Sequence, residues 1–278
     1  MNASTDHPQD RPPGQSSAQV LSPAQVREIL AVHRAWVASG GADGQRAELA
    51  GVNLSRAELQ GAVLRQADLH EATLSGARLQ EADLSGANLQ RSRLYQANFR
   101  GANLESADLA GASLQNAVFQ NASLKSADLA PADLGLADLN RANLTGAQLR
   151  GANLQDTNLR EADLTGADLR KARLQGANLL RTDLSGANLQ GADLSGVNLQ
   201  GANLENAVLQ GANLENADLV QAVLQGANFR KARLQNADLY KADFQNADFR
   251  GADLRNAVGF SRKHIDMAQT DGKTRLRD

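Results

Sequence analysis

Residues 82–86 read Ala82-Asp83-Leu84-Ser85-Gly86, and residues 102–106 read Ala102-Asn103-Leu104-Glu105-Ser106. Both stretches follow a five-residue pattern whose central position is Leu or Phe. The pattern runs from Leu49 through Leu254 without an insertion, which makes 42 consecutive centre positions. A small residue, Ala in most repeats, stands two positions before each centre. Because the period never changes over this length, it decides the fold.

A period of five fits neither regular secondary structure. On an α-helix, five residues advance by about 500°, so successive leucines would scatter around the axis. On a continuous strand, five is an odd number, so successive leucines would alternate between the two faces. Every centre is buried only if the chain bends once per repeat, with the small residue and Leu on one face of a short extended segment.

The bends are marked by the second residue after each centre, which is Gly in 17 repeats and Asn in seven. Both residues tolerate the positive φ that the second central residue of a type II turn requires. We therefore expect positive φ at these corners, and another turn type at corners such as Arg56, Lys171 and Arg181. The residue before the centre is Asp or Asn in 28 of the 42 repeats. We expect its side chain to hydrogen-bond the adjacent corner backbone.

This array of Ala-(Asp/Asn)-Leu-x-x repeats resembles the pentapeptide-repeat family, and the resemblance covers residues 47–256. It implies an all-β fold, namely a right-handed, quadrilateral, parallel β-helix in which four repeats make one coil. We expect the β-helix over residues 46–258. About ten and a half coils stacked about 4.8 Å apart would form a rod roughly 50 Å long.

The N-terminal end of such a rod needs a cover, because unpaired backbone at a solenoid end is a template for strand addition. Residues 22–40 predict a capping α-helix, with Ser22 as N-cap, Pro23 at the first helical position and Gln25 completing a capping box. Trp36, the only Trp in the chain, is interpreted as the plug over the first coil. Residues 1–20 are expected to form a disordered tail.

The C-terminal end, residues 259–278, allows two interpretations. Phe260, Ile265 and Met267 are expected to fold back as a short cap, with a mobile tail after Asp271. Alternatively, the last coil stacks on a second copy, which predicts a homodimer through the C-terminal end.

Composition excludes several classes of site. The chain has no cysteine, which excludes disulfides and thiolate chemistry, and it contains no phosphate-loop, GxGxxG or HExxH motif. We therefore expect no enzyme, no cofactor and no metal site. A signal peptide and a run of roughly 18 apolar residues are both lacking, so we expect a cytoplasmic protein without membrane contact. The net charge of −2 gives no general attraction to nucleic acid.

Charge is distributed unevenly over the four faces of a 20-residue coil. On the face centred on Leu64 through Phe244, six acidic residues stand against Arg65 and Lys125, whereas each other face balances to zero. This acidic face predicts a docking site for a basic partner protein. Its candidate residues are Asp163, Asp183, Glu205 and Asp243.

Two other surface features are candidates for contact. The face centred on Leu69 through Phe249 is acidic in its early coils and becomes basic from Arg150 onward. On the face through Leu179, an apolar column follows the centres, with one interruption at Gln200. Exposed apolar side chains in register can mark a contact surface. The column comprises Leu180, Val220 and Tyr240.

These observations favour a non-catalytic scaffold that binds another protein, of unknown identity, through its flat faces. The family resemblance implies an alternative, because some pentapeptide-repeat proteins are described as mimics of B-form DNA that bind DNA gyrase and protect or inhibit it. The dimensions of the rod suit that alternative. Its near-neutral charge opposes it, since duplex DNA carries one negative charge per ~1.7 Å. An inert spacer without a fixed partner is a third alternative.

Overall fold

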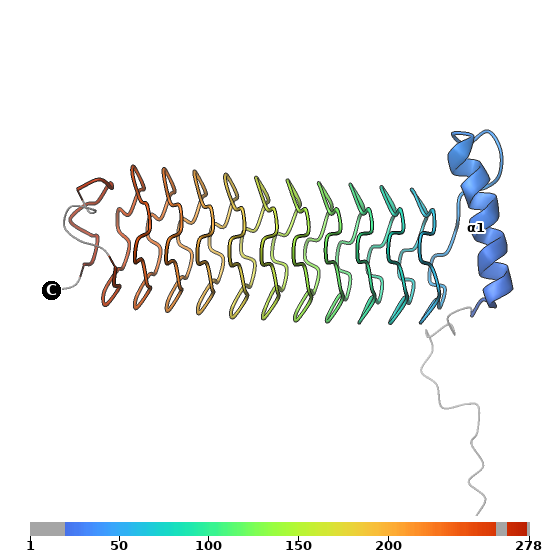
Figure 1. Cartoon of the computed structure of the whole chain (residues 1–278), viewed down its shortest axis with the longest axis horizontal. Helices are drawn as coiled ribbons and strands as arrows, with labels where there is room; N and C mark the ends of the chain where they lie inside the picture. The colour runs from blue at the N-terminus through green and yellow to red at the C-terminus, as the bar shows by residue number, and fades with distance from the viewer. Residues whose placement is uncertain (1–19, 260–265, 277–278) are drawn as a thin grey trace, which may run out of the picture.

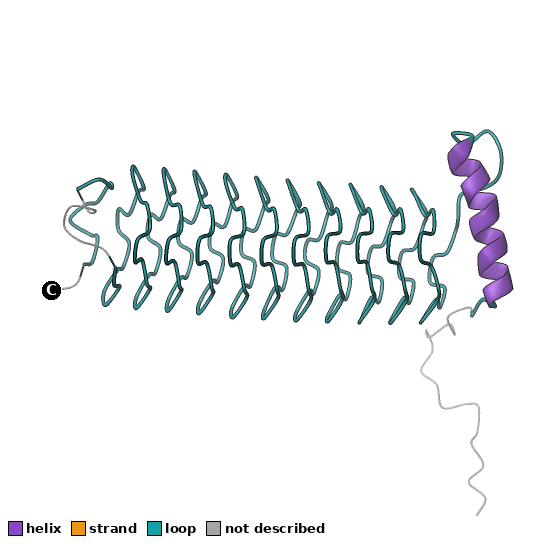
Figure 2. Cartoon of the chain, in the orientation of Figure 1, coloured by secondary structure: helices purple, strands orange, loops and turns teal. Residues whose placement is uncertain are grey.

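The structure is a computed structural model of the 278-residue chain, and it describes residues 20–259 and 266–276. Figure 1 shows a rod of stacked coils with a single helix, α1 (Pro23–Ala38), across the N-terminal end. The coils pair through single residues, so Figure 2 draws no strand arrow over the described part of the chain.

The coils repeat every 20 residues. The residue before each centre forms a parallel bridge with the residue 20 positions later, from Glu48 with Asp68 to Asp238 with Val258. Each coil is therefore joined to the next by one bridge per repeat. This register places side chains that are 20 residues apart in columns along the rod.

The interior of the rod is one continuous apolar core. All 42 centre side chains are buried, and the most exposed of them, Phe244, is 5% exposed. The prediction that every centre is buried is confirmed. Each fully buried Leu contributes about 1.5–3 kcal/mol relative to an exposed one, which stabilises a rod too thin for a globular core.

Backbone hydrogen bonds account for four of the five N–H groups in a repeat. The small residue donates across the turn to the preceding centre, and the next residue donates to the preceding coil. The centre and the second corner residue both donate to the following coil. In one repeat the donors and acceptors are Ala82 N to Leu79 O, Asp83 N to Ala62 O, Leu84 N to Asn103 O and Gly86 N to Glu105 O.

The fifth N–H belongs to the first corner residue, and in 28 of the 42 repeats a side chain accepts it. In the repeat above, Ser85 N donates to Asp83 Oδ1 over 3.1 Å. The same contact forms wherever Asp or Asn precedes the centre, as with Asn53, Asp163 and Asp253. The predicted role of these residues is confirmed. In these 28 repeats the first corner residue thus keeps no unsatisfied backbone donor, which would otherwise be costly.

The corners correct the expectation about turn type. Gly and Asn corners have positive φ as predicted, but so do Arg56, Lys171 and Arg181, at 58°, 59° and 56°. The remaining exception among the 42 corners is Pro131, which follows a cis peptide bond. Arg56 N donates to Ser75 O over 2.9 Å, the bond that a Gly corner makes. The ladder between coils therefore imposes one backbone geometry, whichever side chain the corner carries.

Gly146→Val is expected to lower the free energy of unfolding by about 1–3 kcal/mol. Gly146 has φ +66°, and an added Cβ would meet only Ser126 Oγ, at 3.7 Å, so the cost is torsional rather than steric. The non-Gly corners with positive φ include no Val, Ile or Thr. Gly146→Asn is the matched control and should unfold close to wild type. Equal thermal midpoints for the Val and wild-type proteins would refute the turn argument.

Helix α1 covers the first coil with its apolar face. Ser22 Oγ accepts from Gln25 N, and Gln25 Oε1 accepts from Ser22 N, so the predicted capping box is confirmed. Val26 is buried, and Ile29 and Leu30 pack against the core. The helix therefore shields the apolar interior at this end of the rod.

His33, rather than Trp36, is the residue fully buried over the first coil. Ala47 N donates to His33 Nδ1 over 3.0 Å, and burial lowers the pKa of His33 from its ordinary value of 6.5. Trp36 is half-buried and stacks on His33, with ring centroids 5.6 Å apart. The prediction that Trp36 plugs the first coil is therefore wrong, because His33 takes that place. The first repeat has no preceding centre to accept from Ala47, and an indole offers only a donor, whereas a neutral imidazole offers an acceptor.

Residues 266–276 pair with the last coil. Gln269 and Arg275 form parallel bridges with Asp248 and Asp253, and Ala268 and Leu276 pack against the core. The expectation of a mobile tail after Asp271 is therefore wrong for residues 272–276, because the open edge of the last coil offers backbone groups that they satisfy.

The individual cap residues differ from the prediction. Met267 contributes through its backbone O, which accepts from Asn246 N over 3.0 Å, while the residue is 42% exposed. Phe260 and Ile265 lie outside the described residues. A homodimer through this end stays a prediction.

Candidate functional site

The register brings the predicted acidic residues to one face. Parallel bridges join Asp163 to Asp183 and continue through two further coils to Asp243, so all three occupy one column. Glu205 lies in the neighbouring column, at a first corner position. Asp163 and Asp183 are half-buried, while Glu205 and Asp243 are exposed. At about 4.8 Å per coil, the set spans roughly 20 Å.

Each aspartate in the column is also a structural acceptor. Asp163 accepts from Thr165 N over 2.9 Å and from Thr145 Oγ1 over 3.1 Å. Asp183 accepts from Ser185 N over 2.9 Å. These contacts hold the carboxylates in one orientation, which reduces the side-chain entropy that a partner would have to remove.

The carboxylate of Asp163 is ionised at neutral pH. Burial acts to raise its pKa, but hydrogen bonds from Thr165 and Thr145 outweigh burial and lower the pKa from its ordinary value. The carboxylate of Asp243 is held by two hydrogen bonds, from Gln245 N over 3.2 Å and from Gln225 Nε2 over 2.6 Å. The acidic face therefore presents fixed negative charge.

Basic side chains on the acidic face lie in its early coils. Arg65 Nε is 3.7 Å from Asp83 Oδ2, so the positive charge of Arg65 is paired with the negative charge of Asp83. Lys125 is exposed, and no Lys or Arg follows it in the repeats centred on Leu144 through Phe244. The uncompensated part of the face is therefore its C-terminal half.

The apolar column is in register but does not form a continuous apolar patch. Leu180 and Val220 are half-buried, and Tyr240 is 55% exposed. Gln200 lies between them and donates to Asp218 Oδ2 over 2.6 Å. Lys241 Nζ lies 5.3 Å from the centroid of the Tyr240 ring. Polar groups thus separate the apolar members.

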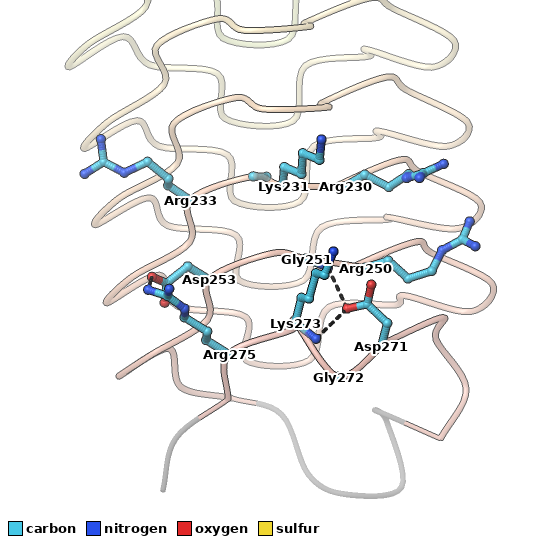
Figure 3. Close-up of a pocket in the computed structure, with 11 residues that line it drawn as sticks. Arg230, Lys231, Arg233, Arg250, Gly251, Asp253, Asp271, Gly272, Lys273 and Arg275 are labelled. Carbon is cyan, nitrogen blue, oxygen red and sulfur yellow. Dashed lines mark hydrogen bonds and ion pairs between the residues drawn. The ribbon is translucent and has the colours of Figure 1, made fainter.

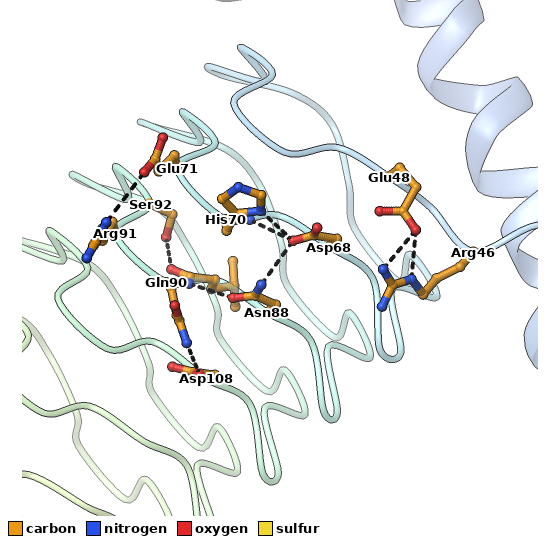
Figure 4. A network of polar contacts seen from close by, with 11 residues as sticks. Arg46, Glu48, Asp68, His70, Glu71, Asn88, Gln90, Arg91, Ser92 and Asp108 are labelled. Atoms are coloured by element: carbon orange, nitrogen blue, oxygen red, sulfur yellow. Dashed lines mark hydrogen bonds and ion pairs between the residues drawn. The ribbon is translucent and has the colours of Figure 1, made fainter.

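Figure 4 shows acidic side chains in the early coils of the face centred on Leu69 through Phe249, each in contact with polar or basic neighbours. Asp68 accepts from Asn88 Nδ2 over 3.1 Å and lies 2.9 Å from His70 Nδ1. Burial acts to raise the pKa of Asp68, but the hydrogen bonds from His70 outweigh burial and lower it. Glu71 pairs with Arg91. Glu71 thus has a basic partner, whereas Asp68 keeps its negative charge within a hydrogen-bond network.

A cavity of about 800 Å³ lies where residues 271–275 meet the last coils. Arg230, Lys231 and Arg250 lie on the face centred on Leu69 through Phe249, as the period predicts, whereas the other basic members come from a neighbouring face and from the C-terminal segment. Arg275 pairs with Asp253, 22 residues earlier, so it lies outside the 20-residue register of the coils. The run of basic residues from Arg150 onward was the sole signal in the sequence. The basic residues are Arg230, Lys231, Arg233, Arg250, Lys273 and Arg275.

Metal-binding groups are not found within the described residues, where no cluster of three His, Cys, Asp or Glu side chains could hold an ion. Nor does any helix in residues 20–259 and 266–276 reach the length and apolar character needed to cross a bilayer.

A model of pentapeptide repeats matches eight copies within residues 47–256. The chain belongs to the pentapeptide-repeat family. No curated protein matches the chain.

Similar solved structures are pentapeptide-repeat proteins. HetL, involved in heterocyst differentiation regulation in the cyanobacterium Nostoc sp. strain PCC 7120, is 34% identical, with a TM-score of 0.44 and coverage of 80% of this chain and 90% of HetL. QnrB1, a plasmid-mediated fluoroquinolone resistance protein, is 21% identical, with a TM-score of 0.41 and coverage of 72% of this chain and 90% of QnrB1. A protein from the Arabidopsis thaliana thylakoid lumen is 38% identical, with a TM-score of 0.34 and coverage of 35% of this chain and 68% of that protein.

Proposed function

We propose that this pentapeptide-repeat protein is a non-catalytic scaffold that docks a basic surface of another protein on its acidic face. The observation that carries the proposal is the column through Asp163, Asp183 and Asp243. The corner backbone holds these carboxylates, and the half of the acidic face on which they lie carries no Lys or Arg. We further take the coil to be right-handed and four-sided, as the family resemblance implies, and the protein to be cytoplasmic.

The proposal is supported by what the rod offers a partner. Wherever Asp or Asn precedes the centre, the backbone donor of the first corner residue is satisfied internally, so these corners offer a partner their side chains. Fixed charges of one sign steer a basic partner into register and disfavour an acidic one. Because exposed charges are screened beyond about 8–10 Å at physiological salt, binding should weaken as salt rises.

The second candidate function is modulation of DNA gyrase by mimicry of DNA. One observation favours it, namely that three carboxylates, Asp163, Asp183 and Asp243, lie in one column along the rod, with Asn203 and Val223 between the last two. The density of charge is against it, since the four acidic residues, Glu205 included, supply about one charge per 5 Å while duplex DNA carries one per ~1.7 Å. The gyrase candidate therefore ranks second.

Neutralising the acidic face is expected to weaken partner binding about tenfold or more. The variant carries Asp163→Asn, Asp183→Asn, Glu205→Gln and Asp243→Asn. Asn keeps the Oδ1 acceptor, as Asn53 does for Ser55 N, so the corners remain intact. The matched control makes the same types of change on the charge-balanced faces. Its substitutions are Asp133→Asn, Asp193→Asn, Glu215→Gln and Asp218→Asn.

Affinity capture from the native cell, repeated with rising salt, measures the effect. A partner retained by the control variant and lost from the neutralised one supports the proposal, and equal retention by both contradicts it. A plasmid supercoiling assay with gyrase separates the two candidates. If the wild-type protein does not alter supercoiling, the gyrase candidate is removed while the scaffold proposal stands.

A further inference from the structure

The cavity near the C-terminus is built by three stacked segments (Figure 3). Arg230 and Lys231 come from one coil, Arg250 and Gly251 from the next, and Lys273 from the segment that closes the rod. A neighbouring column adds Arg233, Asp253 and Arg275. These residues belong to faces other than the acidic face, so this site is independent of the proposed docking surface.

Gly251 keeps the floor of the cavity free of a side chain. Its φ is +70°, and an added Cβ would lie 3.5 Å from Lys231 Cγ. Lys231 and Lys273 therefore lie beside a corner that carries no side chain.

Asp271, the acidic residue nearest this floor, is committed to local structure. Its Oδ1 accepts from Gly251 N over 2.9 Å, from Lys273 N over 3.0 Å and from Thr274 Oγ1 over 3.1 Å. Figure 3 shows the first two of these contacts. Asp271 thus anchors the closing segment and holds Lys273 at the cavity.

The cavity carries more positive than negative charge. Six cationic and two acidic side chains line it, in a chain whose net charge is −2. Arg233 pairs with Glu215 and Arg250 with Asp248, which lowers the excess. Within the described residues, Arg230, Lys231 and Lys273 have no carboxylate at ion-pair distance. Like charges gathered in a cleft repel one another and concentrate anions from solution.

The lining also defines the class of anion. Arg and Lys side chains bind phosphate oxygens well, Arg through paired N–H groups and Lys as a point charge. Ala232 is the apolar member of the lining, and there is no aromatic ring on which a nucleobase would stack. The volume suits a ligand larger than one phosphate, and it is a pocket rather than a groove for a duplex. We propose that this pocket binds a short chain of phosphates, held between Lys231, Lys273 and Arg230.

Isothermal titration of the full chain with sodium tripolyphosphate tests the proposal. Wild-type protein is expected to bind in one saturable step that weakens as salt rises. The variant Arg230→Gln, Lys231→Gln, Lys273→Gln is expected to bind about tenfold more weakly or worse, since each side chain supplies a charge-assisted contact. Gly251→Asn fills the floor with a residue that adopts positive φ at Asn246 and Asn256, and it should also weaken binding.

The matched control is Arg56→Gln, Arg100→Gln, Lys125→Gln, which makes the same change in net charge at exposed positions elsewhere. It should bind as wild type does. Equal losses in the two triple variants would mean general charge attraction and would overturn the proposal, as would an absence of binding by the wild type.

Titration with ATP distinguishes a free chain of phosphates from one carried by a nucleotide. Binding of ATP and tripolyphosphate with similar affinity, and of AMP far more weakly, is expected. Binding of duplex DNA without binding of tripolyphosphate would also overturn the proposal.

Discussion

Phe119→Ala is expected to lower the free energy of unfolding by about 3–5 kcal/mol. Phe119 is fully buried, and its ring stacks on that of Phe99 with centroids 4.7 Å apart. The substitution removes the ring and its stacking contact with Phe99 together. The coils on either side cannot close the cavity, because hydrogen bonds at every repeat set their separation. Urea denaturation followed by circular dichroism measures the loss.

Phe119→Leu is the matched control, since Leu occupies 37 of the 42 centres. Its cost should be about 1.5 kcal/mol or less, because Leu suits the surrounding coils. If the Ala variant is as stable as the Leu variant, the core is not packed as described. A solenoid can unfold in stages, so both variants are to be compared under one fitting model.

Deletion of residues 1–40 is expected to cause aggregation at concentrations where the full chain stays in solution. The deletion removes α1, and with it the His33 acceptor for Ala47 N and the cover over Leu49 and Leu54. The first coil then exposes apolar side chains and an unpaired backbone edge, which together template association. Size-exclusion chromatography with light scattering detects the aggregates.

Deletion of residues 1–19 is the control for chain length, because it retains Val20, whose bridge to Asn53 precedes α1, and the whole of the helix. This shorter deletion should behave as the full chain does. A protein lacking residues 1–40 that remains monodisperse and keeps its melting temperature would show that α1 does not act as a cap.

The interior of the rod was predictable from the repeat because each position has one environment. A centre such as Leu84 is buried in every coil, and Asp83 accepts from the first corner residue, Ser85, in the way its counterparts do. The corners at Arg56 and Lys171 were predicted wrongly for a related reason. Residue preference describes an isolated turn, whereas in the rod the neighbouring coils hold the backbone through the hydrogen bonds of Arg56 N and its equivalents.

The acidic face was predictable residue by residue, since a period of 20 places Asp163, Asp183 and Asp243 in one column. The corner contacts that orient these carboxylates followed from the pattern. Their unequal exposure did not, because it depends on the length and placement of side chains in adjacent columns.

The sequence by itself determined the coil, its core and the composition of each face, because a strict period converts position in the chain into position in space. Only the tertiary structure shows which residues cover the two ends of the rod, because the period stops there and position in the chain no longer gives position in space. There, His33 replaces Trp36 over the first coil because an orphaned N–H needs an acceptor. At the other end, residues 271–275 leave the register, and their contacts with the last coil bring Lys273 and Arg275 to a pocket that no spacing in the chain predicts.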